Sequence, residues 1–147
     1  MKTRSEYEKL FESKVIADHE TDHLLVTIYS NNIAHIYVKA GQRVTLETVE
    51  ETQAYFATLG EEKRYYMIFE YGPLADLDPE VRTSRAKKGG SKYALVDAFV
   101  VNSLGHRLIA DFYLRFNRPK RPTRIYSSVE KAAEWCLKKI QKARQSA

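Results

Sequence analysis

The chain has only one cysteine, Cys136, among its 147 residues, so no disulfide can form within it. This thiol falls on the apolar stripe of a predicted helix, where a free cysteine behaves as a small buried hydrophobic residue. We therefore expect a packing role for it and no redox function.

Long apolar runs are also missing. A membrane-spanning helix needs roughly 18 to 20 consecutive apolar residues, and the run from Ala94 to Val101 is far shorter. Residues 1–13 contain no apolar core of the kind found in secretory signals. The sequence predicts a cytoplasmic protein with no membrane span.

Recognisable catalytic sets are missing as well, because no Ser/His/Asp or Cys/His set, glycine-rich phosphate loop or pocketed carboxylate pair is evident. One literal motif remains. The segment from His19 to His23 reads H-E-T-D-H and matches H-E-x-x-H, in which a helix directs two imidazoles at zinc. Asp18 and Asp22 make its surroundings polar, a β-rich run follows at once, and no third ligand is evident. We expect no metal, no cofactor and no enzymatic activity.

The chain does contain alternating strand and helix patterns. Residues 94–143 read as strand, helix, strand and helix, with β-prone segments at Ala94 to Val101 and Thr123 to Tyr126. A chain of this length with 44% hydrophobic residues supports one core. We predict a single α/β domain with a mixed sheet, an antiparallel amino-terminal hairpin and helical crossovers between the later strands.

The last helix gives the clearest pattern. Ser127 and Glu130 fit an S-x-x-E capping box at its start. Apolar residues then follow with helical spacing on one face: Val129, Ala132, Ala133, Cys136, Leu137 and Ile140. We predict that this face packs in the core.

The predicted hairpin comprises His23 to Tyr29 and Ile33 to Val38, joined by Ser-Asn-Asn, a turn signal because Asn tolerates positive φ. Residues 1–22 lack a strong period. We predict that they form an appendage, either a short helix or disordered chain, and that residues 23–147 form the domain.

Between the hairpin and residue 94, Thr45 caps a predicted helix that Gly60 ends. Arg64 to Tyr71 is a predicted strand. Asp78 and Pro79 then begin a poor helix, which extends to Lys88 and has little apolar surface.

The predicted order of hairpin, helix, strand, helix, strand, helix, strand and helix resembles the STAS fold of sulfate-transporter and anti-sigma-factor-antagonist domains. Local sequence narrows this resemblance through V-N-S-L at 101–104, R-L-I at 107–109, Phe112, F-N-R-P at 116–119, P-T at 122–123, Ala133 and Trp135. At these positions the chain resembles a SpoIIAA-like (STAS/SEC14-type) family of small uncharacterised bacterial proteins. The resemblance spans about residues 24–140.

This resemblance implies a single-domain STAS-like fold that acts as a non-enzymatic regulatory or protein-interaction module. In anti-sigma antagonists, a Ser or Thr after an Asp at the start of the second helix is phosphorylated by a partner kinase. The matching loop, residues 71–79, has no Ser or Thr. The partner-binding candidates here are therefore Asp76 and Asp78, with Thr83 and Ser84 one turn later.

Basic residues concentrate toward the carboxyl end, with nine Lys or Arg against two Glu from Arg118 onward. Arg118, Lys120, Arg121 and Arg124 lie in or beside a P-x-x-P loop and are anion-binding candidates, unless this loop is only a joint with solvated charges. Trp135 lies among lysines, away from the apolar helix face. It is a candidate partner anchor, with packing over the neighbouring loop as the alternative.

Three functions remain open. A protein-binding module comes first, and a second copy of the chain is one candidate partner. A carrier of a small apolar ligand or lipid, as the SEC14-type resemblance implies, comes second and would need a cavity lined by Phe99, Phe112 and Phe116. A polyanion binder comes third, with weak, sequence-independent nucleic-acid binding, because no feature for reading bases is evident.

Overall fold

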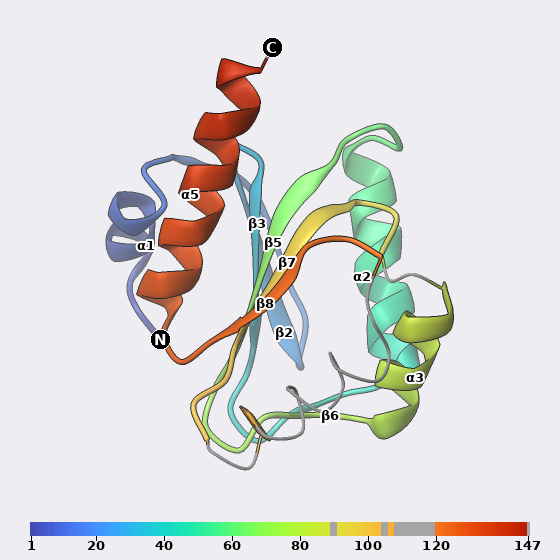
Figure 1. Ribbon diagram of the computed structural model, residues 1–147. Coiled ribbons are helices and arrows are strands. Elements are labelled where there is room, and N and C mark those ends of the chain that lie inside the picture. Colours follow the sequence, from blue (N-terminus) through green and yellow to red (C-terminus); the bar gives the residue numbers. More distant parts are fainter. Residues whose placement is uncertain (89–90, 104–105, 108–119, 147) are drawn as a thin grey trace.

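The computed structural model describes residues 1–88, 91–103, 106–107 and 120–146 (Figure 1). Its centre is a six-stranded sheet in the order β1-β2-β3-β5-β7-β8. The strands are β1 (Val15–Glu20), β2 (Leu24–Tyr29), β3 (Ile33–Val38), β5 (Tyr65–Tyr71), β7 (Ala94–Val100) and β8 (Thr123–Tyr126). The first three pair antiparallel, and the rest continue parallel from β3. The predicted mixed α/β sheet is confirmed.

Helices cover both faces of this sheet (Figure 1). α1 (Arg4–Leu10) and α5 (Val129–Gln145) lie on one face, and α2 (Leu46–Leu59) and α3 (Pro79–Lys88) on the other. Because α2 follows β3 and α3 follows β5, both connect parallel strands, as predicted for helical crossovers. None of the helices within the described ranges is long and apolar enough to cross a membrane.

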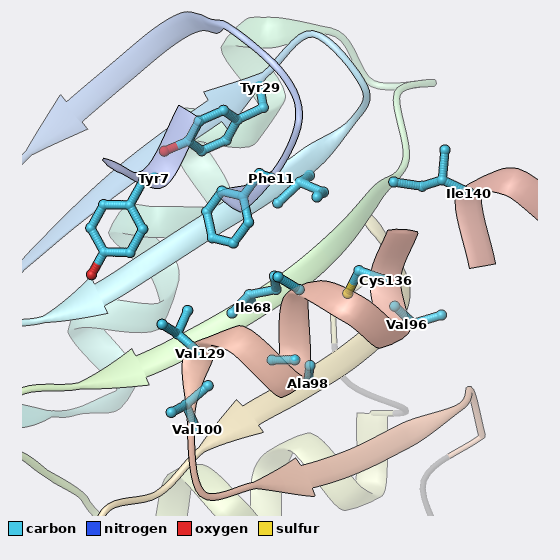
Figure 2. Close-up of a cluster of buried hydrophobic side chains, with 13 residues drawn as sticks. Tyr7, Phe11, Tyr29, Ile68, Val96, Ala98, Val100, Val129, Cys136 and Ile140 are labelled. Carbon is cyan, nitrogen blue, oxygen red and sulfur yellow. The ribbon is translucent and has the colours of Figure 1, made fainter. Parts of the chain in front are cut away.

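The core beneath α1 and α5 is drawn in Figure 2. Cys136 and Ile140 point from α5 toward Ile68 and Val96 of the sheet, while Phe11 covers the neighbouring strands. Five of the six residues on the predicted α5 stripe are buried, and Leu137 is partly buried at its margin. The predicted core face of this helix is confirmed.

The start of α5 differs from the prediction by one residue. Ser128, not Ser127, is the N-cap, and its side-chain oxygen accepts a hydrogen bond from the amide of Lys131. With Ser128 as the N-cap, the third helical residue is Lys131, so Glu130 is not placed to complete a capping box; its carboxylate instead binds the ammonium group of Lys2 at 2.8 Å. Two adjacent serines offer the same capping chemistry, so the sequence alone did not distinguish them.

The prediction that residues 1–22 form an appendage is wrong, although the short helix expected there is present. β1 pairs with β2 as the edge of the sheet, with a bulge between Val15 and Ala17. Tyr7 and Phe11 are buried in the core with α5. A boundary at residue 22 would cut through both the sheet and this core.

The predicted turn between β2 and β3 and the predicted ends of α2 are confirmed, whereas the helix predicted between β7 and β8 falls largely on residues outside the described ranges. Asn32 has φ 71° in the β2–β3 turn, and Thr45 caps α2 by accepting a hydrogen bond from the amide of Thr48. Gly60 ends α2 with φ 137°. Phe56 of α2 packs on the sheet in a second core that includes Met67.

Candidate functional site

The loop from Gly72 to Asp78, at the carboxyl end of β5, is held against the segment that follows β3. The amide of Gly72 donates to the carbonyl of Val38, that of Gly41 donates to Pro73, and that of Asp76 donates to Gln42. β6 (Asp76–Leu77) then pairs parallel with β4 (Arg43–Val44). The loop therefore has a fixed shape, set by backbone contacts on both sides.

Gly72 permits this close approach. A Cβ atom at this position would lie 2.8 Å from the hydroxyl oxygen of Tyr37 and 2.9 Å from the amide nitrogen of Ala40. Both distances are shorter than a carbon can tolerate. Glycine is therefore needed here so that the loop can lie on the end of β3.

Leu74, at the tip of this loop, has two unusual properties. Its φ is 60°, in the left-handed region that leucine avoids at a cost of roughly 1–2 kcal/mol. Its side chain is 90% exposed, the largest exposure among the large hydrophobic residues described. The fold thus holds an apolar side chain in water on a strained backbone, an arrangement that packing within the chain does not explain.

Charged side chains follow Leu74 in the same loop, at Asp76 and Asp78. The guanidinium group of Arg43 reaches Asp76 at 3.3 Å and Asp78 at 3.1 Å. His106 Nε2 lies 3.7 Å from the other oxygen of Asp76. The structure therefore joins two of the predicted partner-binding residues, Asp76 and Asp78, through Arg43, which sequence reasoning missed. We call residues 72–78 and Arg43 the β5 loop surface.

The other partner-binding candidates on this side belong to α3. The hydroxyl of Thr83 donates to the carbonyl of Pro79 within the same helix, and Ser84 is half-buried. The side chains of Arg82 and Arg85, which flank Thr83 and Ser84 in the sequence, are outside the described residues.

A cleft of about 410 Å³ opens at the carboxyl ends of β5 and β7, between the amino-terminal ends of α1 and α5. Among its lining residues are Lys2, Glu70, Asn102 and Glu130. Sequence reasoning missed this cleft because its walls come from residues that are more than a hundred positions apart in the chain.

Glu70 connects the cleft to a buried polar network. One of its oxygens accepts a hydrogen bond from the hydroxyl of Tyr7 at 2.7 Å and lies 2.9 Å from Nε2 of His35. His35 is only 1% exposed and packs against the ring of Tyr7. Burial alone would raise the pKa of Glu70, but the hydrogen bonds from His35 and Tyr7 outweigh it and hold the pKa below 4.5. Glu70 is therefore an ionised carboxylate that ties α1 to the sheet.

The predicted anion-binding residues differ in their exposure to solvent. Arg121 is mostly buried and forms an ion pair of 2.5 Å with the buried carboxylate of Asp97 on β7, a residue that the sequence did not single out. Lys120 and Arg124 are exposed. Arg118 lies outside the described residues.

Trp135 is half-buried at the margin of the core. Its ring contacts Tyr126 of β8, and the cationic groups of Arg124 and Lys139 each lie 5.6 Å from the ring centroid. Trp135 therefore packs on β8 within basic surroundings, and its role as a partner anchor stays a prediction.

The H-E-x-x-H segment is not a helix. His19 lies on β1, where its ring stacks on Tyr55 of α2, and Nδ1 of His23 lies 2.9 Å from the side-chain oxygen of Gln42. The two imidazoles thus have separate neighbours. Across the described ranges, no three His, Cys, Asp or Glu side chains gather as they would around a metal ion.

An apolar cavity lies between α2 and the sheet, with Phe56 and Phe69 among its lining residues. Its volume of about 40 Å³ is well below the roughly 150 Å³ of a cavity that holds benzene. The cavity is therefore too small for a lipid. Of the predicted cavity residues, Phe99 stacks on Phe69, while Phe112 and Phe116 lie outside the described residues.

A comparison with protein families matches residues 27–141 to a domain of unknown function, DUF7793. The matched segment runs from β2 to α5 and leaves α1 and β1 outside, although both pack in the same fold. No curated protein and no solved structure matches the chain. Because the family match covers well over half of its length, the chain belongs to the DUF7793 family.

Proposed function

We propose that this protein is a non-enzymatic STAS-like regulatory module that binds a protein partner through the β5 loop surface. The exposed Leu74 carries the proposal. Apolar side chains held in water beside charged groups are typical of sites at which a partner buries a few anchor residues inside a polar rim.

The surroundings of Leu74 support this proposal. Because the loop is fixed by its hydrogen bonds to the segment after β3, little conformational entropy would be lost on binding. Arg43, Asp76 and Asp78 would supply the polar rim and orient the partner. The resemblance to STAS domains also supports it, since the matching part of anti-sigma antagonists is the part acted on by a partner kinase.

Affinity purification from the native cell, with quantitative identification of the recovered proteins, tests the proposal. Leu74→Asp should abolish recovery of the specific partner, because the anchor becomes a charge. Ile16→Asp is the matched control, since Ile16 is also exposed, at 59%, but lies on β1. The control should recover the partner as the unchanged protein does.

The proposal would be refuted if Leu74→Asp and Ile16→Asp recovered the same proteins in the same amounts. With the partner purified, Leu74→Asp should weaken binding by at least about tenfold, the effect of losing roughly 1.4 kcal/mol of contact energy. Circular dichroism of both variants establishes that they remain folded.

A further inference from the structure

A second surface, distinct from the β5 loop surface, lies on α5. Lys131, Trp135, Lys138, Lys139 and Lys142 recur at i, i+4, i+7, i+8 and i+11, so they share one face of the helix, away from the core stripe. Arg124 of β8 extends this face onto the sheet, because its guanidinium group lies over the Trp135 ring.

The cations of this surface are largely uncompensated. Lys138 pairs with Glu134 at 3.2 Å. Arg124, Lys131, Lys139 and Lys142 form no ion pair with a carboxylate within the described part of the chain. An aromatic ring flanked by unpaired cations offers both apolar contact area and a positive potential to an acidic partner.

β8 supplies a backbone edge beside this surface (Figure 1). Among the described residues it pairs only with β7, through the carbonyls of Pro122 and Tyr126, which accept from Asp97 and Val101. In a parallel ladder, alternate residues direct their backbone groups to opposite sides. The amides of Thr123 and Ile125 therefore point away from β7.

We propose that β8 and the basic face of α5 together bind an extended acidic segment of a protein partner. The segment adds as a strand to the outer edge of β8. An added strand lies about 4.8 Å beyond β8, so alternate acidic side chains on the α5 side come next to Arg124, Trp135 and Lys139. Main-chain hydrogen bonds position the segment, and the cations select its charge.

The opposite edge of the sheet does not suit the same segment. β1 carries the exposed carboxylates of Asp18 and Glu20 and contains a bulge, so it repels acidic chains and interrupts regular pairing. Nucleic acid is disfavoured at the β8 surface because three unpaired lysines on α5 and Arg124 on β8 neutralise few phosphates. An acidic peptide, by contrast, can form hydrogen bonds with the backbone of β8 and ion pairs with the cations beside it.

Nuclear magnetic resonance of the full ¹⁵N-labelled chain tests the proposal. The probe is an eight-residue peptide in which Glu alternates with Val, and the control peptide has Gln in place of Glu. We expect saturable shifts of the Thr123 and Ile125 amides and of the Trp135 indole N–H, with β1 amides unchanged. The Gln peptide should bind at least about tenfold more weakly, since it lacks the charge.

Charge-reversal variants distinguish binding at this surface from nonspecific electrostatic attraction to the whole chain. Arg124→Glu combined with Lys139→Glu should weaken binding of the Glu peptide by at least about tenfold. Lys63→Glu changes the net charge on an exposed loop elsewhere and should have less than about a twofold effect. Shifts at β1 instead of β8, equal binding of the two peptides, or equal effects of the two charge changes would overturn the proposal. Tighter binding of oligothymidylate or of anionic phosphatidylglycerol vesicles than of the Glu peptide at about 0.15 M salt would also overturn it.

Discussion

Replacing Tyr7 with phenylalanine would test whether the hydrogen bond to Glu70 fastens α1 to the sheet. The change removes one oxygen atom and keeps the ring, which is 2% exposed and packs against Phe11 and His35. The hydroxyl donates the 2.7 Å bond to Glu70 and accepts a longer one, of 3.3 Å, from the amide of Lys2. Tyr7→Phe therefore removes the hydrogen bonds of this hydroxyl, of which the bond to ionised Glu70 is the stronger, and keeps the packing of the ring.

The expected loss follows from the state of Glu70. A hydrogen bond to an ionised group contributes about 1.5–3 kcal/mol. Glu70 keeps its contact with His35, and its side chain is 14% exposed, so water can replace part of the lost bond. We expect Tyr7→Phe to lower the free energy of unfolding by about 1.5–2 kcal/mol and the melting temperature by about 3–8 °C.

The pH dependence of this loss has a definite sign. Because the pKa of folded Glu70 lies below 4.5, its ionised form contributes stability that is present above pH 4.5 and is lost as the pH falls through the folded pKa. Without the Tyr7 hydroxyl, this pKa is lowered less. The difference between Tyr7→Phe and the unchanged protein should therefore shrink as the pH falls below 4.5.

Urea unfolding, followed by fluorescence of the single tryptophan, Trp135, measures these differences. Tyr29→Phe is the matched control, because Tyr29 is 1% exposed and its hydroxyl has no hydrogen-bond partner among the described residues. Its effect should be below about 0.5 kcal/mol. A Tyr7→Phe effect as small as that of the control, or one that stays constant through the acid range, would refute the reasoning.

Three further predictions concern α5. Ser128→Ala should cost about 1 kcal/mol and Ser127→Ala less than about 0.5 kcal/mol, because only Ser128 caps the helix; thermal melts of both variants test this. Ile140→Ala should cost about 2–5 kcal/mol in urea unfolding and Leu137→Ala clearly less, since Leu137 is only partly buried. Burial raises the pKa of Cys136 to about 12, so iodoacetamide at pH 8 should modify it in urea but not in the native protein, as mass spectrometry would show.

The elements that the sequence predicted best are those whose pattern is local and strong. The α5 stripe repeats over several turns, and the β2–β3 hairpin combines two β-rich runs with an Asn turn, so nearby residues already specify each of them. β1 escaped prediction because every second residue faces water, and Asp18 and Glu20 at those positions made the segment look like a polar tail. The alternation of half-buried and exposed residues was present in β1, but its six residues were too few for the pattern to be recognised.

The site residues needed tertiary information. An exposed Leu74 cannot be foreseen, since an isolated leucine in a loop gives no sign of its burial or its φ. Arg43 meets Asp76 only because β4 and β6 pair in parallel with these two residues in register. Glu70 and His35 come together because β3 and β5 are adjacent, which the order of elements alone does not reveal.

The placement of α1 has a consequence for the order of folding during synthesis. Two of the contacts that hold α1 and the residues before it are with residues made much later, namely Glu70 through Tyr7 and Glu130 through Lys2. A helix of seven residues is too short to persist alone, so α1 stays unfolded on the ribosome until β5 and then α5 have emerged. Tyr7 and Phe11, with the sheet face that they later cover, are exposed throughout that interval and are available to chaperones that bind apolar segments.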